Sequence, residues 1–211
     1  LAERQGRERA WRRMLVAQGL ADTASLRALE VGCGDGSGLL ELLRLGFEPA
    51  QLAGIELLEE RSARARERLP AAVRLWQGDA TSIDAGDGAW DLVTASTVFS
   101  SLLDDAFQQR LADAMWRWLR PGGVVVAYDF AVDNPRNPDV RGMPVARWRR
   151  LFPEGALQAQ RLTLAPPLAR ALGRVHPALI GWAGALPLLR THRLVWIRKP
   201  APPPAHPRPE P

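Results

Sequence analysis

Glycines occupy positions 32, 34, 36 and 38, directly after a short, largely apolar run that contains the acid Glu30. Residues 26–31 predict a buried strand and the amphipathic pattern from Ser37 predicts a helix, so the glycines form a tight turn between the two. Glycine allows positive φ and places no Cβ in the path of a ligand. The turn also directs the unpaired N–H groups of the helix N-terminus toward that ligand. The pattern therefore predicts a ligand-binding strand–turn–helix unit.

The spacing of these glycines excludes the dinucleotide fingerprint Gly-x-Gly-x-x-Gly. Starting at Gly32, the fingerprint requires a glycine where the chain has Ser37, and starting at Gly34 it requires one where the chain has Leu39. A nicotinamide-dependent dehydrogenase is therefore disfavoured. A tight strand-to-helix turn that binds no ligand is the simpler alternative for this motif taken alone.

The same residues fit acid-x-Gly-x-Gly-x-Gly, with the acid at 30, which resembles the first motif of the class I S-adenosylmethionine-dependent methyltransferases. Further segments follow in the order of that family, and together they cover roughly residues 26–130. These segments are Glu56 after the second predicted strand, residues 78–80 after the third, 95–101 after the fourth and 120–123 before the fifth. The resemblance implies S-adenosylmethionine as cofactor and methyl transfer as activity.

The resemblance also implies roles for single residues. Glu30 would bind the ammonium of the cofactor, directly or through water, and Glu56 would bind both ribose hydroxyls. Asp79 and the backbone of Ala80 would contact the adenine. The full set expected to bind the cofactor is Glu30, Gly32, Cys33, Gly34, Glu56, Leu57, Asp79, Ala80, Ser96, Thr97 and Ser101.

A candidate general base is Asp129, at the carboxyl end of the fifth predicted strand. The sulfonium already activates the methyl group, so the protein has to align the acceptor and exclude water. A hydroxyl acceptor would also benefit from a base, for which Asp104, Asp133 and Ser101 are alternatives. Many members of the family carry a histidine near position 101, which this chain lacks. No metal is expected, although Asp129, Asp133 and Asn134 could imitate the metal loop of catechol-type relatives.

Cys33 is the sole cysteine, which excludes an intramolecular disulfide and a cysteine-based metal site. We expect it to be a small packing residue, because no histidine lies near it in the sequence to activate a thiol. A single free cysteine fits a reducing compartment. Arginines interrupt every apolar run before Leu15, so no secretory signal is predicted there. The expected location is the cytoplasm.

The composition is that of a soluble globular protein, with 46% hydrophobic and 24% charged residues among 211. The net charge is +5, and Lys199 is the only lysine. The arginines are spread along predicted helices beside acids rather than gathered in one stripe, so a nucleic-acid partner is not favoured. Methylation of RNA remains an alternative.

The order of elements predicts an α/β fold: a Rossmann-like, doubly wound, mostly parallel seven-stranded sheet with an antiparallel last strand and helices on both faces. We expect residues 1–25 to form a helix that covers the cofactor site, 26–199 the methyltransferase domain, and 200–211 a proline-rich disordered tail. An apolar insertion at about 166–189 is expected to be a helical lid over the substrate. Its unbroken apolar part is too short to span a bilayer, and a homodimer face or contact with a membrane surface remains open.

The expected reaction is methyl transfer to a hydroxyl of a small molecule, such as a sugar, a glycolipid precursor or a secondary metabolite. The final third of the chain resembles small stand-alone bacterial methyltransferases in a diffuse way. N-methylation of a small molecule or peptide is the first alternative. A cofactor-binding partner subunit without catalytic activity is the second.

Overall fold

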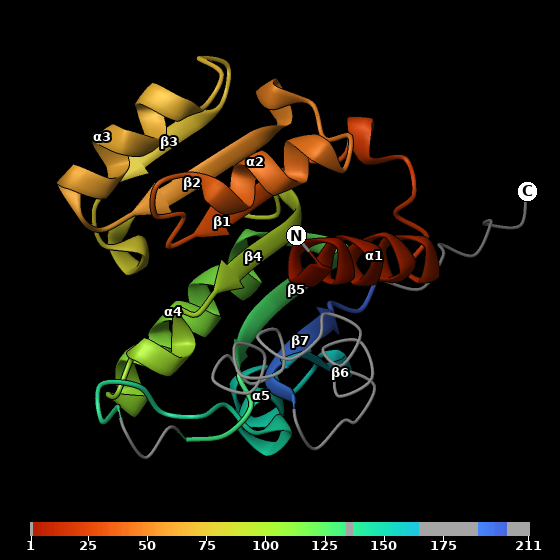
Figure 1. Ribbon diagram of the computed structural model, residues 1–211, viewed down its shortest axis with the longest axis vertical. Coiled ribbons are helices and arrows are strands. Elements are labelled where there is room, and N and C mark those ends of the chain that lie inside the picture. The colour runs from red at the N-terminus through yellow and green to blue at the C-terminus, as the bar shows by residue number, and fades with distance from the viewer. Residues whose placement is uncertain (1, 134–136, 165–189, 202–211) are drawn as a thin grey trace, which may run out of the picture.

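The computed structural model describes residues 2–133, 137–164 and 190–201. These residues form one seven-stranded sheet in the order β3-β2-β1-β4-β5-β7-β6, which runs across Figure 1 from upper left to lower right. Neighbouring strands are parallel except that β7 is antiparallel to both β5 and β6. The strands are β1 Ala28–Val31, β2 Leu52–Glu56, β3 Arg74–Gln77, β4 Trp90–Ser96, β5 Leu119–Phe130, β6 Ala156–Leu164 and β7 Arg190–Arg198. The predicted fold class is confirmed.

Helices cover both faces of the sheet (Figure 1). One apolar cluster joins one face of β4 and β5 to α1, α2 and α3, and a second cluster joins the other face to α4 and α5. The central strands are apolar on both sides for this reason: Val124 and Val126 enter the first cluster, and Val125 enters the second. The helices are α1 Ala2–Ala17, α2 Ser37–Arg44, α3 Glu59–Arg68, α4 Asp105–Trp118 and α5 Val145–Leu151.

The strand order reverses at β1, which pairs with β2 on one side and β4 on the other. Open α/β sheets bind ligands beyond the carboxyl ends of their strands at such a point. The glycine turn follows β1, and the 3-10 turn η4 Phe99–Ser101 follows β4 at the same edge. The topology thus brings the predicted cofactor-binding segments together.

Some predicted boundaries differ from the structure. The sequence places residues 120–123 before the fifth strand, but β5 begins at Leu119, because Leu119 already pairs with Trp90 across a register shift. β6 and β7 form an antiparallel pair, and β7 lies between β5 and β6, so of these two strands only β6 is at an edge of the sheet. The insertion predicted at 166–189 and most of the predicted tail lie outside the described residues. In the described part, no helix is long and apolar enough to cross a membrane.

Candidate functional site

The glycine turn between β1 and α2 is held in a conformation that side chains would disrupt. Gly32 has φ +65°, and a Cβ at this position would lie 2.6 Å from Cγ2 of Val98. The N–H of Cys33 donates to the carbonyl of Ile55 at 3.0 Å, which ties the turn to the end of β2. Glycine at position 32 is therefore required by both the left-handed backbone and the close approach of the segment after β4.

Glu56, the last residue of β2, ties the turn to the following loop. One carboxylate oxygen accepts from the N–H of Gly34 at 2.8 Å and the other from the N–H of Leu58 at 2.9 Å. The side chain is 5% exposed and lines the cavity described below. Two charge-assisted hydrogen bonds thus fix the carboxylate beside the glycine turn.

Glu30 lies in β1 under the first turn of α2. A Cβ on Gly38 would collide with the carboxylate, lying 2.6 Å from its Cδ, so glycine at 38 makes room for the acid. Glu41, one turn further along α2, is also buried and lines the same cavity. Three glutamates, 30, 41 and 56, therefore line one cavity, and Arg61 is the one cationic residue among its described lining residues. This excess of negative charge favours a cationic ligand group.

Cys33 lies among these acids. Burial first, and then the charges of Glu30 and Glu56, raise the pKa of its thiol to about 12. The thiol therefore stays protonated at neutral pH, which fits the packing role expected from the sequence and not a nucleophile.

A cavity of about 520 Å³ lies at the carboxyl ends of β1, β2 and β4. Of the predicted cofactor-binding residues, those that line it are Glu30, Gly32, Cys33, Gly34, Glu56, Leu57, Ser96, Thr97 and Ser101. Asp79 and Ala80 are not among the lining residues. The carboxylate of Asp79 instead accepts from the N–H and hydroxyl of Thr81 at 2.8 and 2.9 Å. Their contact with adenine stays a prediction.

Thr97 gives the β4 side of the cavity its shape. It has φ +55°, the only positive value for a described residue other than glycine. Its N–H donates to the carbonyl of Tyr128 at 2.7 Å, and its carbonyl accepts from the hydroxyl of Ser101 at 3.0 Å. Strained backbone of this kind persists where surrounding contacts enforce it, and it is concentrated at functional sites.

Several lining residues were not predicted to be part of the site, among them Trp11, Glu41, Thr94, Leu102 and Tyr128. Glu41 carried a signal in the sequence, since it lies beside Leu42 on the buried side of α2. Burial of a carboxylate on the apolar face of a helix is costly unless the group is paired, so such a residue is a candidate for the site. The positions of Trp11 and Tyr128 depend on how distant elements pack, and no local pattern marks them.

Asp129, the candidate base, does not line this cavity. Successive residues of a strand point to opposite faces, so Tyr128 lines the cavity and Asp129 faces the α4 side. The carboxylate is 2% exposed and accepts from the N–H groups of Ser100 at 3.1 Å and Phe130 at 2.9 Å. Burial raises its pKa, and these hydrogen bonds oppose the rise. Its role as a base stays a prediction, and its contacts hold η4 in place.

The alternative bases also bind backbone groups. Asp104 caps α4 by accepting from the N–H groups of Ala106 and Phe107 at 2.7 and 2.9 Å. Asp133 accepts from the N–H of Gly142 at 2.7 Å. Within the part of the chain that the structure describes, no group of three or more His, Cys, Asp or Glu residues could hold a metal. Asn134, named with the metal loop, lies outside that part.

Comparisons with known proteins agree with this geometry. A family model described as a methyltransferase domain matches residues 28–123. The fatty-acid O-methyltransferase of Mycolicibacterium smegmatis is 34% identical over 140 residues, 65% of this chain and 46% of the relative. The trans-aconitate 2-methyltransferase of Variovorax paradoxus is 32% identical over 153 residues, 72% of this chain and 56% of the relative. The chain thus spans about half the length of these curated relatives.

A solved S-adenosylmethionine-dependent methyltransferase from Mesorhizobium loti has the same fold. The TM-score is 0.64 at 18% identity, with 89% of this chain and 96% of the other covered. The match of the methyltransferase-domain model over residues 28–123, the sheet order and the acidic glycine turn agree with the resemblance to the class I S-adenosylmethionine-dependent methyltransferases. The cofactor of that family is S-adenosylmethionine. Its cationic groups fit a glycine-walled cavity with three carboxylates.

Proposed function

We propose that this protein transfers a methyl group from S-adenosylmethionine to an oxygen atom of a small molecule. One observation supports the proposal most directly: the two sides of the 520 Å³ cavity differ in chemistry. The β1–β2 side carries the carboxylates of Glu30, Glu41 and Glu56. The β4–β5 side carries hydroxyl and apolar side chains, such as Ser101, Leu102 and Tyr128, and none of its described lining residues is an acid or a histidine.

In this mechanism the cofactor supplies a methyl group that its sulfonium already activates. The residues of the chain hold the reactants in line and exclude water, which can account for much of the rate enhancement. Glu30 would attract and orient the cationic end of the cofactor, and Glu56 would accept hydrogen bonds from its ribose hydroxyls. Val98 and Leu102 form an apolar wall on the acceptor side, and the hydrogen bonds of Thr97 fix that wall relative to β5.

Two oxygen acceptors are candidates. A hydroxyl is the acceptor predicted from the sequence, and it would require a base to remove its proton. A carboxylate is the second candidate because it is already ionised at neutral pH, and the described lining of the β4–β5 side contains neither acid nor histidine. Two relatives are named for organic acids, a fatty acid and trans-aconitate, which supports this second candidate.

Calorimetric titration with S-adenosylmethionine, and in parallel with NADH, tests the cofactor. We expect micromolar binding of S-adenosylmethionine only. Glu56→Ala should weaken it by about ten-fold or more, equivalent to about 1.4 kcal/mol. Glu59→Ala is the matched control, because Glu59 is an exposed acid three residues away in α3 that does not line the cavity. Tighter binding of NADH, or equal losses in both variants, would contradict the proposal.

Transfer of labelled methyl groups to a panel of hydroxy compounds, carboxylic acids and amines tests the acceptor. Mild base releases methanol from a methyl ester but not from a methyl ether, so the product identifies the oxygen that was methylated. We expect label on an oxygen. Labelling of amines alone would replace the proposal with the N-methylation alternative. Cofactor binding without methyl transfer would favour the alternative of a partner subunit that binds the cofactor but has no catalytic activity.

A further inference from the structure

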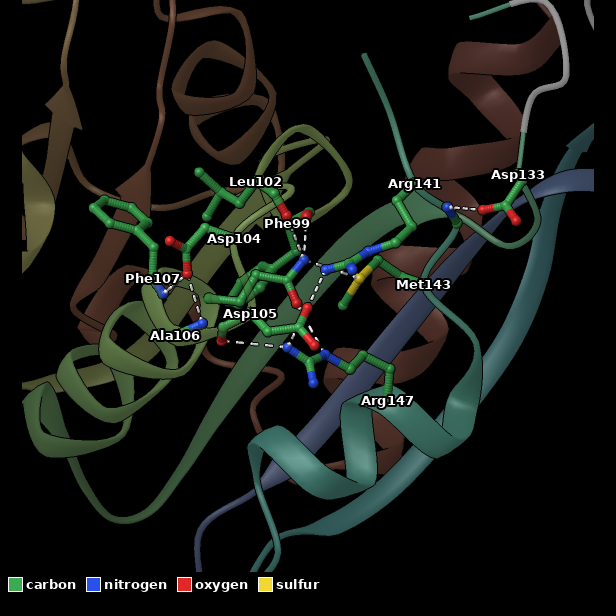
Figure 2. A network of polar contacts seen from close by, with 12 residues as sticks. Phe99, Leu102, Asp104, Asp105, Ala106, Phe107, Asp133, Arg141, Met143 and Arg147 are labelled. Carbon is green, nitrogen blue, oxygen red and sulfur yellow. Dashed lines mark hydrogen bonds and ion pairs between the residues drawn. The ribbon is translucent and has the colours of Figure 1, made fainter. Parts of the chain in front are cut away.

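A second cavity, of about 460 Å³, lies beyond the end of β5. One wall is formed by residues 131–133 and by residues 141, 142 and 144, all of which lie between β5 and α5. The N–H of Arg141 donates to the carbonyl of Ser100 at 2.8 Å, and the N–H of Met143 donates to the carbonyl of Phe130 at 2.8 Å. Figure 2 shows this segment beside the start of α4. The cavity therefore has walls held by backbone hydrogen bonds.

Three guanidinium groups line this cavity, those of Arg141, Arg147 and Arg150, together with the carboxylates of Asp105 and Asp133. Arg141 and Arg147 both pair with Asp105, as Figure 2 shows, and the second pair has an N–O distance of 3.1 Å. Arg150 is exposed and has no acidic partner among the described residues. Three cationic groups against two anionic groups leave an excess positive charge. The 520 Å³ cavity between the glycine turn and β4, called the cofactor cavity below, has the opposite excess.

Arg147 is oriented before any ligand binds. Its Nε donates to Oε1 of Gln108 at 2.9 Å, and its Nη2 contacts the carboxylate and the carbonyl of Asp105. Gln108 is itself buried and fixed, since its Nε2 donates to the carbonyls of Phe99 at 2.7 Å and Leu102 at 2.8 Å. No described residue accepts from Nη1 of Arg147. A fixed guanidinium with a remaining donor suits a carboxylate or phosphate, which guanidinium groups bind in a planar fork.

The second cavity is called the arginine cavity below. A short stretch of chain borders both this cavity and the cofactor cavity. Ser101 and Leu102 line the cofactor cavity, Asp105 lines the arginine cavity, and the carbonyl of Ser100 accepts from Arg141. Both cavities open at the carboxyl edge of the sheet, on the side of β4 and β5. To use both cavities, an acceptor has to reach past this stretch, with its reactive oxygen near Tyr128 and its anionic group at the arginines.

We propose that the arginine cavity, with Arg141, Arg147 and Arg150, binds an anionic group of the methyl acceptor, a carboxylate or a phosphate. This inference rests on the proposed function, because it assigns the substrate class of the same enzyme. Asp105 keeps two of the arginines in place, and the excess positive charge selects an anion. The acceptor is then an acidic small molecule, and a neutral analogue lacks the interaction.

Calorimetric titration of the full chain with citrate and with inorganic phosphate, at constant ionic strength, tests the anion site. We expect one anion to bind per chain, and the tighter of the two probes shows which anionic group fits. Arg150→Gln should weaken that binding about five-fold and Arg147→Gln about ten-fold or more. Arg149→Gln is the matched control, because Arg149 is also exposed on α5 but does not line the cavity; it should change binding by less than about two-fold.

The alternative is that these arginines only fasten the segment after β5 to α4. In that case Arg147→Gln would lower the melting temperature and Arg150→Gln would change nothing, and neither anion would bind at a single site. Equal weakening by Arg149→Gln and Arg150→Gln would also overturn the proposal, because it would show a general effect of charge. Arg147→Lys keeps the charge but loses the fork, so affinity between those of wild type and Arg147→Gln is expected.

A kinetic arm separates this inference from the proposed function. Once a carboxylate-bearing acceptor is found, Arg150→Gln should raise its KM about five-fold and leave kcat and S-adenosylmethionine affinity unchanged. The KM of a neutral amide analogue should be the same in both proteins. If Arg150→Gln leaves the KM of the carboxylate-bearing acceptor unchanged, the anion site is rejected and the proposed function is retained. Anion binding as expected, without transfer to any acceptor, rejects the proposed function alone.

Discussion

At the scale of single residues, the missing side chain of Gly38 leaves the space that the Glu30 carboxylate occupies. In Gly38→Ala the new methyl group would occupy space that the Glu30 carboxylate fills, so the acid must move. If Glu30 binds the cofactor as predicted, this movement weakens that contact. The gain in helix propensity, up to about 1 kcal/mol, offsets part of the packing cost. We therefore expect S-adenosylmethionine affinity to fall about ten-fold or more while the protein still folds. Calorimetry on the folded variant measures the affinity for S-adenosylmethionine. Unchanged affinity would show that Glu30 does not bind the cofactor.

Cys33 offers a second test at this scale. Because its pKa is raised to about 12, almost none of the thiol is ionised at pH 8, and burial blocks reagents as well. We expect Ellman's reagent to modify the folded protein at least about a hundred-fold more slowly than the urea-unfolded protein. The unfolded protein is the control for reagent quality. Rapid modification of the folded chain would show that the turn opens or that the thiol is reactive.

At the scale of elements, η4 is the segment whose position matters most. Asp129 accepts from the N–H of Ser100, and Gln108 donates to the carbonyl of Phe99, at the start of η4, and to that of Leu102, just after its end. These buried contacts set the wall formed by Ser101 and Leu102. A change at Asp129 or Gln108 therefore acts on the acceptor side of the cavity from a distance.

Asp129 also makes stability depend on pH. Its folded pKa is raised above the ordinary 3.8, so the fold favours the protonated carboxyl. The stability that this group contributes is fully present below the unfolded pKa and is lost as pH rises through the folded pKa. Urea unfolding of wild type and Asp129→Asn, between about pH 4 and pH 8, should show the wild-type advantage shrinking as pH rises. An advantage that grows with pH would mean that the carboxylate, not the acid, is stabilised.

The same variant tests the role of Asp129 in the reaction. We expect Asp129→Asn to keep measurable turnover, because the carboxylate does not line the cavity. Loss of turnover with unchanged S-adenosylmethionine affinity would instead support the base predicted from the sequence. Comparison of the two pH–rate profiles adds a second readout, since removal of a base abolishes the acidic limb of the profile.

At the scale of the whole molecule, α1 connects the cofactor cavity to β7, beyond the central strands of the sheet. Trp11 lines the cavity and packs edge-to-face on Trp196 of β7, with ring centroids 5.2 Å apart. Beyond the helix, the side chain of Gln18 accepts from Nε of Arg198 at 2.8 Å. We propose on this basis that α1 covers the cofactor site, as the sequence predicted for residues 1–25.

Trp11→Ala tests this arrangement. Removal of a buried tryptophan should lower the free energy of unfolding by about 3–5 kcal/mol. It should also weaken the binding of S-adenosylmethionine. Val16→Ala is the control on the same helix: its side chain is 66% exposed, and it should change stability by no more than about 0.5 kcal/mol. Equal small effects in urea unfolding would mean that α1 does not pack stably on the sheet.

The sequence by itself determined the order of strands and helices and the local form of the cofactor turn. The spacing of the four glycines and of Glu30 and Glu56 depends on backbone sterics and on strand and helix periodicity, which act over a few residues. For the same reason most of the predicted cofactor-binding residues line the cavity. The parallel sheet followed from the alternation of strands and helices.

Only the tertiary structure decided which distant side chains share a cavity. A shift of one residue in a strand moves a side chain to the other face, and this places Tyr128 in the site and Asp129 behind it. Trp11 reaches the cavity from a separate helix, and β7 inserts between β5 and β6. The arginine cavity likewise joins Asp105 to Arg141 and Arg147. These contacts depend on packing between layers, which local sequence patterns do not encode.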